Sequence, residues 1–372
     1  MSAHKQEPKE KFADLRHIIM EGSPFEMGLQ HGHQAADLII RAAEFCNAHS
    51  PGFPEDQIDH VKREALRIER YIESTWPEIS AEMRGISEGS GVPFPDVVML
   101  NVRFEIDPEA FPKCTIVGIP QTGDGPVIGK TDDVSIAEQK LEVFFRAYPD
   151  NGLPCIYFAI AGTVWAVGGI NSAGLAMAHA GLPPGQRRPN GLPAEIFLRL
   201  LLQRCSTVCE ALEFVKSTPL LWWGHSIALA DPSSDQITLV EAYPYAVDAE
   251  SSTTDPIVRT NHPVLEKIRK AAVGESKLPP IYAALPENSQ QRYVNAMRLA
   301  SQLPKSIDGV RLFLGDHSEP GAICQHGQAD MHTAVAMILV PRRRSMIVSE
   351  GYGCGLYREY VCGAKHFPLE PA

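Results

Sequence analysis

The feature that most constrains the fold of this chain is a change of pattern at Cys114. Before it, the segment 56–88 carries apolar residues at helical spacing with charges between them, which predicts that residues 1 to about 100 are mainly helical. After it, two apolar runs flank a glycine-containing turn at 122–125, a pattern typical of a β-hairpin. Cys114 is therefore expected to begin a strand, at a position that suits a nucleophile made by cutting the chain.

The rest of the chain predicts two series of strands with helices beside them. Strands that follow one another directly favour antiparallel pairing. Two such blocks with helices outside them predict a layered α+β sandwich, and no internal repeat is visible. After the hairpin, strands are expected at 141–147, 155–160, 164–170, 175–179, 225–230, 236–241, 333–340 and 345–349, and helices at 193–203, 207–217, 289–302 and 307–314.

Length and charge limit the classes of function. A chain of 372 residues can bury a sizeable core as one large domain or as two intimate halves. The formal charge of -11 offers no basic stripe for phosphates, which argues against a nucleic-acid partner. The charged N-terminus lacks an apolar signal region and no stretch is apolar enough to cross a bilayer, so we expect a cytoplasmic enzyme with no membrane partner.

The cysteines and histidines give little support for a metal or a disulfide framework. Eight cysteines are too sparse and irregular for such a framework, and no Cys-x-x-Cys occurs. Cys205 and Cys209 have the spacing of one helix face, where packing is the simpler interpretation than metal binding. His31 and His33 lack convincing partner ligands and are expected at the surface or in a cap. We therefore expect no metal and no bound cofactor.

Several separated segments, taken in order, resemble a known family. The chain resembles the acyl-coenzyme A:6-aminopenicillanic acid acyltransferase family, a group of N-terminal-nucleophile hydrolases distantly similar to bile salt hydrolases and penicillin V acylases. The resemblance runs from about residue 20 to 355. The matching segments begin at Glu21-Gly22-Ser23-Pro24, Leu100-Asn101-Val102-Arg103, Cys114-Thr115, Gly129-Lys130-Thr131-Asp132-Asp133, Gly169-Ile170-Asn171, Arg259-Thr260-Asn261, Ser289-Gln290-Gln291-Arg292 and Asp316-His317.

The resemblance implies a fold and a maturation step. The fold is a four-layer αββα sandwich, in which two antiparallel sheets face each other and helices cover both outer sides. The Cys114 thiol is implied to attack the carbonyl of Lys113, so that water releases a mainly helical segment 1–113 and a catalytic segment 114–372, which form one globular unit. The family commonly has glycine before the cysteine, and this chain has Lys113, which meets a steric penalty in the strained backbone that the attack requires.

A cysteine that heads a chain carries its own base. An α-amino group has a pKa of about 7.7 to 8.0 and a free thiol one of about 8.5, so the amine can accept the thiol proton close to neutral pH. Nucleophile and base then occupy one residue.

The resemblance also implies roles for other residues. Asp133 matches the aspartate that steadies the amine, with Asp132 as the alternative, and Lys130 stands where bile salt hydrolases carry an arginine near the thiol. Asn171 matches a turn asparagine that donates to the oxyanion, although a plain hairpin turn also explains it. The remaining matches are Asn261, for the oxyanion pocket or the amine, and Arg292, which points into the site.

Other candidates have simpler structural interpretations. A cysteine–histidine dyad with His262 or His317 is not needed by an N-terminal cysteine, so both are expected to be structural. Two further sets could bind substrate, but a solvated loop and core packing explain them as well. These are Arg187 and Arg188, which could meet a coenzyme A phosphate, and Trp165, Trp222 and Trp223, which could line an acyl pocket.

Three functions stay open from the sequence. The first is an amidohydrolase that cleaves a small N-acyl compound through a Cys114 thioester, and the second is an N-acyltransferase with a coenzyme A thioester as co-substrate. The third is a binding protein that keeps the fold without cleavage. A papain-like protease is disfavoured because its signature surrounds no cysteine. We expect the two cleaved chains to associate, and a homo-oligomer is open.

Overall fold

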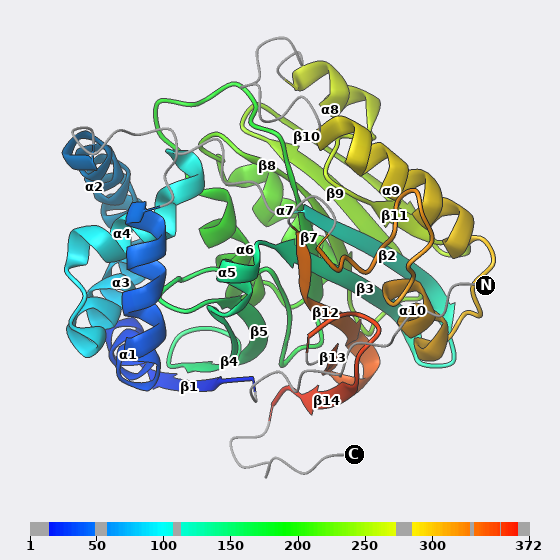
Figure 1. The fold of residues 1–372 in the computed structure, drawn as a ribbon, viewed down its shortest axis with the longest axis horizontal. Helices are drawn as coiled ribbons and strands as arrows, with labels where there is room; N and C mark the ends of the chain where they lie inside the picture. Colours follow the sequence, from blue (N-terminus) through cyan, green and yellow to red (C-terminus); the bar gives the residue numbers. More distant parts are fainter. Residues whose placement is uncertain are drawn as a thin grey trace.

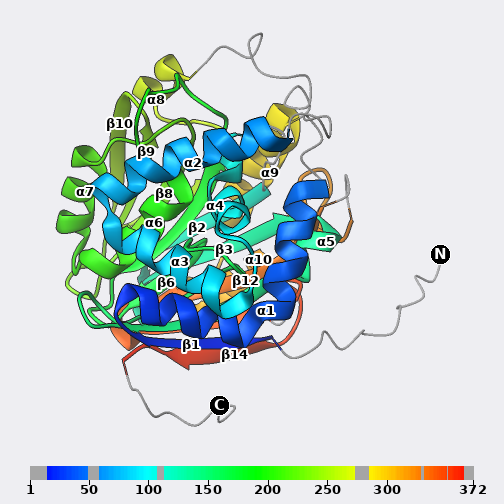
Figure 2. The ribbon, with the colours of Figure 1, turned by 90° about the vertical axis from the view of Figure 1, so that its left-hand side faces the viewer.

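Two β-sheets lie face to face in the computed structural model, and helices cover the outer side of each (Figure 1). The structure describes residues 15–48, 58–106, 113–272, 285–327, 331–349 and 351–363. The view turned by 90° shows α1 to α4 lying across one outer side (Figure 2). The expected four-layer αββα sandwich is confirmed.

The larger sheet has eight strands in the order β1-β4-β5-β6-β7-β8-β9-β10. β1 pairs with β4 in parallel, and all the other neighbours in this sheet are antiparallel. The strands are β1 (His17–Gly22), β4 (Glu142–Pro149), β5 (Cys155–Ile160), β6 (Gly168–Asn171), β7 (Ala176–Leu182), β8 (Gly224–Ala230), β9 (Ile237–Tyr243) and β10 (Ala246–Ser252).

The smaller sheet has six strands in the order β11-β2-β3-β12-β13-β14, all antiparallel. Its centre is the hairpin of β2 and β3, closed by the turn where Thr122 lies opposite Gly125, as the sequence predicts. The strands are β2 (Lys113–Thr122), β3 (Gly125–Val134), β11 (Ile257–Arg259), β12 (His332–Val340), β13 (Ser345–Ser349) and β14 (Tyr357–Val361).

Helices on the two outer sides come from different parts of the chain. α1 (Pro24–Ala48), α2 (Ile58–Thr75), α3 (Pro77–Ser90), α4 (Phe94–Val102), α6 (Ala194–Arg204) and α7 (Val208–Ser217) share one apolar cluster with the eight-stranded sheet. α9 (Leu285–Ala300) and α10 (Ile307–Leu314) pack on the six-stranded sheet. The short helices α5 (Ile136–Gln139) and α8 (Glu266–Ala271) lie in connections.

Alternation along the strands sorts side chains between the layers. In β5, Tyr157 joins the cluster under the helices, whereas Ile156 and Phe158 face the space between the sheets. In β2, Val117 faces α9 and α10, whereas Cys114 joins the cluster between the sheets. Each sheet is buried on both faces because successive side chains point to opposite sides.

Glycines bring α1 and α3 into contact along their backbones. A Cβ atom on Gly85 would lie 2.2 Å from the Phe25 carbonyl oxygen, and one on Gly28 would lie 2.0 Å from the Glu82 carbonyl oxygen. Such distances leave no room for a side chain, so this part of the first family-like segment serves helix packing. His31, expected at the surface, is instead fully buried on α1, where its Nε2 accepts from the Gly162 amide.

The expected elements agree with the structure except at particular places. The segment 56–88 forms two helices, because Pro77 begins α3 after α2 has ended at Thr75. Its first two residues, like the charged N-terminus, lie outside the described residues. The expected strand at 164–170 is strand only from Gly168. Four strands were not expected, namely β1, β10, β11 and β14.

Among the described residues, no helix is both long and apolar enough to span a membrane.

We predict that Gly85→Ala destabilises the protein. The new methyl group meets the Phe25 carbonyl oxygen, and overpacking of this kind costs about 1–3 kcal/mol, which outweighs the gain of about 1 kcal/mol in helix propensity. Thermal unfolding followed by circular dichroism should show a lower midpoint. Gly123→Ala is the control, because a Cβ there meets nothing within 4 Å, and equal midpoints for the two variants would contradict the packing argument.

Candidate active site

Cys114 lies near the start of β2, on the face that points to the other sheet. It is directly opposite Asp132 of β3, and Lys130 lies two residues before Asp132 on the same strand. Residues directly opposite, and those two apart, share one face of a sheet, so the three side chains meet. Cys114 is 0% exposed, so its thiol is enclosed in the intact chain.

The thiol lies between a cation and a carboxylate. Lys130 Nζ is 3.3 Å from the Cys114 Sγ, and the thiol donates to Asp132 Oδ1 at 3.2 Å. Lys130 and Asp132 also form a buried ion pair. Burial raises the pKa of the Cys114 thiol to about 12, since the opposing effect of Lys130 is partly cancelled by the two aspartates Asp132 and Asp133.

A glycine in the opposite sheet leaves room for Met337, next to Lys130. A Cβ atom on Gly168 of β6 would lie 2.5 Å from Met337 Sδ and 3.6 Å from Lys130 Cδ. Burial opposes the charge of Lys130, but Asp132 and Cys114 keep the pKa of this ammonium above its ordinary value. Lys130 is therefore a fully buried cation beside the thiol.

The backbone of Cys114 is held by two side chains from distant segments. Its amide nitrogen donates to Asn261 Oδ1 at 2.9 Å. Arg292 Nη1 donates to the Cys114 carbonyl oxygen at 2.5 Å and to Thr115 Oγ1 at 3.0 Å. Arg292 Nη2 also donates to Asn261 Oδ1 at 2.7 Å, which links the two holding groups.

Neighbouring groups fix Asn261 and Arg292 in turn. The Asn261 side chain donates to the Gly181 carbonyl oxygen of β7 at 3.1 Å, and its backbone nitrogen donates to Ser289 Oγ at 2.8 Å. Arg292 Nε donates to Asn288 Oδ1 one turn earlier on α9, at 3.0 Å. Burial lowers the pKa of the Arg292 guanidinium. The side chains of Asn261 and Arg292 are thus both fixed by groups other than Cys114.

Asp133 lies beside Asp132 in sequence but makes different contacts. Its Oδ1 accepts from Thr333 Oγ1 of β12 at 2.6 Å, and its Oδ2 accepts from Thr131 Oγ1 at 3.4 Å. Burial raises the pKa of Asp133 to about 6, although Arg292 and the Thr333 hydrogen bond oppose this rise. The carboxylate that the thiol contacts is Asp132, which the resemblance gave as the alternative to Asp133 for steadying the amine.

A further carboxyl group, Glu142 of β4, lies against Asp132. Burial raises the pKa of Glu142 well above its ordinary value, and the Asp132 charge and hydrogen bond add to the rise. Sequence reasoning missed Glu142, because it lies on the other sheet and only the packing of the two sheets brings it to Asp132. It also missed Thr333, whose only signal was its place at the start of an apolar run.

The Asn171 side chain, for which the resemblance implies an oxyanion role, bonds backbone groups away from Cys114 in the intact chain. Its side-chain nitrogen donates to the carbonyl oxygens of Leu202 and Cys205, at 2.9 and 2.7 Å. Its side-chain oxygen accepts from the amides of Ala173 and Leu175. Both amide hydrogens are used in closing the β6–β7 turn onto the end of α6, as the hairpin interpretation predicts.

The histidine and arginine candidates contact other groups. His262 Nδ1 lies 2.7 Å from Ser289 Oγ, beside the Asn261 backbone contact. Arg187 donates to the Glu105 carbonyl oxygen and to Glu64. Arg188 donates to the Pro244 carbonyl oxygen at 2.5 Å. Trp165 and Trp223 are buried in the helix-side core, and Trp222 is packed against it.

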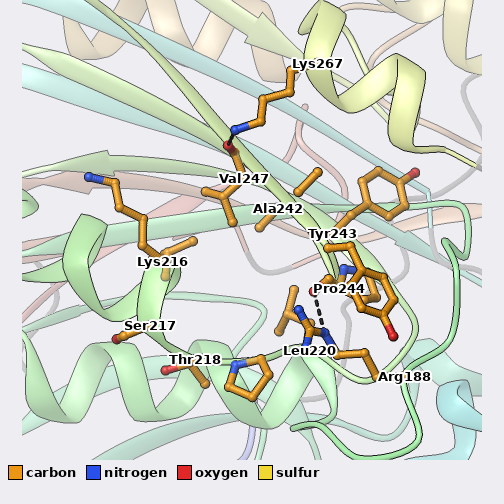
Figure 3. Close-up of a pocket in the computed structure, with 14 residues that line it drawn as sticks. Arg188, Lys216, Ser217, Thr218, Leu220, Ala242, Tyr243, Pro244, Val247 and Lys267 are labelled. Carbon is orange, nitrogen blue, oxygen red and sulfur yellow. Dashed lines mark hydrogen bonds between the residues drawn. The ribbon is translucent and has the colours of Figure 1, made fainter.

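A cavity of about 550 Å³ is lined by residues other than Cys114 and its neighbours (Figure 3). Its lining includes the cations Arg188, Lys216 and Lys267 together with Tyr243 and Tyr245. Neither Cys114 nor any of the residues that contact it is part of that lining.

The model of the acyl-coenzyme A:6-aminopenicillanic acid acyl-transferase family matches residues 121–350, which are more than half of the chain. The chain belongs to this family. The match begins after Cys114 and includes the segments that carry Lys130, Asp132, Asn261 and Arg292.

Two curated relatives of this family member match it over part of their length. The acyl-coenzyme A:6-aminopenicillanic-acid-acyltransferase 40 kDa form of Emericella nidulans is 28% identical over 214 residues, which are 55% of this chain and 57% of the relative. An uncharacterized protein of Archaeoglobus fulgidus is 27% identical over 251 residues, 58% of this chain and 42% of the relative. The chain thus spans about half the length of these relatives.

Solved structures with some likeness to this acyl-transferase family member are more distant. The Caenorhabditis elegans ortholog of N-acylethanolamine-hydrolyzing acid amidase has a TM-score of 0.43 at 13% identity, over 62% of this chain and 93% of that one. A variant of the conjugated bile acid hydrolase of Clostridium perfringens has a TM-score of 0.41 at 10% identity, over 68% of this chain and 100% of that one.

We predict that Asp133 contributes a stability that falls as the pH rises. Its pKa is about 6 in the folded state against an ordinary 3.8, so the folded protein binds this proton more tightly than the unfolded chain. That contribution is complete below about pH 4 and is lost as the pH rises through about 6, and its size is up to about 3 kcal/mol. Urea unfolding at several pH values measures it.

The comparison for this prediction is made in a Cys114→Ala background, so that every sample is one intact chain. Adding Asp133→Asn should flatten the fall in unfolding free energy between about pH 4 and 6. Adding Asp308→Asn, at a side chain that is 83% exposed, should leave the slope as it is. Parallel curves for the two double variants would show that Asp133 does not titrate in this range.

Proposed function

We propose that this chain is a self-cleaving cysteine amidohydrolase that hydrolyses the amide bond of a small N-acyl compound through a Cys114 thioester. The observation that carries the proposal is the way one residue is held at three points. The amide nitrogen of Cys114 meets Asn261, its carbonyl oxygen meets Arg292, and its thiol lies between Lys130 and Asp132. Any buried residue needs partners for its backbone, but a packing role does not require a cation and a carboxylate at the thiol.

The intact chain has the properties of a precursor. The thiol is fully buried and its pKa is about 12, so it is protonated at neutral pH and closed to external substrates. Lys130 acts against the rise in the thiol pKa, because a cation 3.3 Å from the sulfur favours the thiolate. The chain can therefore attack its own neighbouring carbonyl before it can attack anything else.

In the cleavage step, the Cys114 thiol passes its proton to Asp132 and the sulfur bonds to the carbonyl carbon of Lys113. The C–N bond to Cys114 breaks, its nitrogen gains a proton and becomes an amine, and Lys113 is left as a thioester on the sulfur. Water then hydrolyses the thioester, giving a carboxylate on Lys113 and restoring the thiol. The backbone at Lys113 must adopt the geometry that this attack requires without the conformational freedom of glycine.

In the catalytic step, the new amine is the base. It would remain within reach of Asn261 Oδ1, which already accepts from the same nitrogen at 2.9 Å. The amine takes the thiol proton, the sulfur attacks the substrate amide carbon, and the substrate amine leaves with that proton. Water attacks the resulting thioester and releases the acid. Asp133 and Arg292 are the charged residues we assign to steadying the amine and the Cys114 backbone.

The two cleaved segments are expected to stay together. β1 belongs to the segment 1–113 and pairs along its whole length with β4 of the segment 114–372. α1 to α4 also share one apolar cluster with β4, β5, α6 and α7. This contact resembles a domain core, which does not separate in water.

A second candidate is N-acyl transfer, which differs only in the acceptor of the acyl group. The family description and the Emericella nidulans relative favour it, since both name an acyl-coenzyme A acyltransferase. In that case a coenzyme A thioester would acylate Cys114 and an amine would replace water in the last step.

We predict that the purified protein consists of two chains, residues 1–113 and 114–372, and that Cys114→Ala remains a single chain. The thiol is the only group that can form the thioester, so its removal stops cleavage completely. Intact-mass spectrometry measures this directly. Cys209→Ser, at an exposed cysteine of α7, is the matched control and should be cleaved normally. A wild-type chain that stays intact and still hydrolyses amides would overturn self-cleavage.

We further predict that a chromogenic N-acyl amide leaves an acyl group on Cys114 after rapid acid quenching. The added mass should lie on the peptide that begins with Cys114, because the thioester is formed there. Excess amine then separates the two candidates. A constant yield of free acid supports hydrolysis, whereas conversion of the acyl group to the new amide supports transfer. An absence of the acyl-enzyme in both cases, with turnover, would contradict a thioester mechanism.

A further inference from the structure

Four metal-binding side chains meet beside the six-stranded sheet, outside the site around Cys114. They are His317 and Cys324, which follow α10, His326, which precedes β12, and Cys354, between β13 and β14. Their ligand atoms all lie within 4.8 Å of one another. The elements that carry them lie together in Figure 1.

Three of the six ligand-to-ligand distances, all measured from His326 Nε2, are close to the edges of a tetrahedron around a zinc ion. With Zn–N bonds of about 2.0–2.1 Å and Zn–S bonds of about 2.3 Å, the expected edges are about 3.3 Å for N···N and about 3.6 Å for N···S. In the structure, Nε2 of His317 and Nε2 of His326 are 3.1 Å apart. The sulfurs of Cys324 and Cys354 lie 3.4 and 3.5 Å from Nε2 of His326.

The frame that presents these ligands is built by other contacts. The amides of Ile323 and Cys324 donate to the Asp316 carbonyl oxygen, which places Cys324 beside His317. The ring of His326 stacks on Tyr352, with ring centroids 3.8 Å apart. The Asp316 carboxylate accepts from the Ser318 amide and from Asn295 of α9. The ligand positions are therefore set by backbone and aromatic contacts as well as by the four side chains.

We propose that His317, Cys324, His326 and Cys354 bind one structural Zn²⁺ ion. Two thiolates and two imidazoles are a ligand set that zinc prefers, and four protein ligands leave no open position for a substrate. On binding, the two thiols lose their protons to solvent and the two thiolates balance the charge of the ion. His317, His326 and Cys354 are exposed, so an ion can enter from solvent.

The site would join segments that also contact the catalytic region. The Gln325 amide, next to Cys324, donates to Thr333 Oγ1 at 2.9 Å, and this hydroxyl donates to Asp133 at 2.6 Å. A zinc ion between Cys324 and Cys354 would hold this loop against the connection between β13 and β14. The expected absence of a metal was based on spacing, because no short Cys-x-x-Cys marks the site and Cys354 is far from the other ligands in sequence.

The inference is independent of the proposed amidase function, because it is tested by metal content and not by turnover. Wild-type protein, stripped with a chelator and dialysed with zinc under reducing conditions, should retain one equivalent by elemental mass spectrometry. Cobalt substitution should give the visible ligand-field bands of a tetrahedral site together with thiolate-to-cobalt charge transfer.

Cys354 and His317 are exposed, so we expect their replacement to leave the fold intact. Cys354→Ser and His317→Ala should both lose the retained zinc and the cobalt bands, while Cys209→Ser, at an exposed cysteine of α7, should keep them. Removing zinc should lower the thermal midpoint of wild type and leave that of Cys354→Ser unchanged. Circular dichroism confirms that each variant is folded.

Three results would overturn the proposal. The first is loss of zinc from reduced wild-type protein on dialysis. The second is equal retention of zinc by Cys209→Ser and by the ligand variants. The third is a disulfide between Cys324 and Cys354, found by peptide mapping in protein kept reduced. Self-cleavage is recorded in the same samples by intact mass. Failure of cleavage with zinc retained would count against the proposed function alone.

Discussion

The structure around Cys114 depends on the hydrogen bonds that Arg292 and Asn261 make to its backbone. They join the start of β2, the segment after β11 and α9, which are far apart in sequence. All three residues are almost completely buried, so each polar group must find a partner inside the protein. Removing Arg292 would take away this donor to the Cys114 carbonyl oxygen, and removing Asn261 would take away this acceptor for the Cys114 amide nitrogen.

Charge between the two sheets is the second constraint. Lys130 and Asp132 form an ion pair between the sheets, with Glu142 and the Cys114 thiol beside it. Arg259 and Glu241 form a second buried ion pair in the same layer. A buried pair of this kind is weak evidence of stability, because desolvation offsets most of the attraction. Apolar residues could fill this space equally well. The presence of the Lys130–Asp132 ion pair beside the thiol therefore favours a chemical role, since perturbed ionisable groups collect at functional sites.

The sequence predicted the central strands well and the sheet edges poorly. The four strands that were missed, β1, β10, β11 and β14, are the four edges of the two sheets. Central strands are apolar on both faces, whereas an edge strand such as β10 is half exposed and carries polar residues, so its pattern resembles a loop. In the site, matched residues such as Asn261 did reach Cys114, but Asn171 did not, because a turn motif fits a hairpin wherever it lies.

The sequence by itself determined the layers, the position of Cys114 at the start of a strand and the family of the chain, because alternation, turns and ordered motifs are local properties. Only the tertiary structure decided which groups face the thiol. Asp132 and not Asp133 contacts it because of the register of β2 against β3, and Glu142 reaches Asp132 because the sheets pack face to face. The Cys–His cluster likewise exists only in three dimensions, since its ligands come from separate segments that α10 and β12 to β14 bring together.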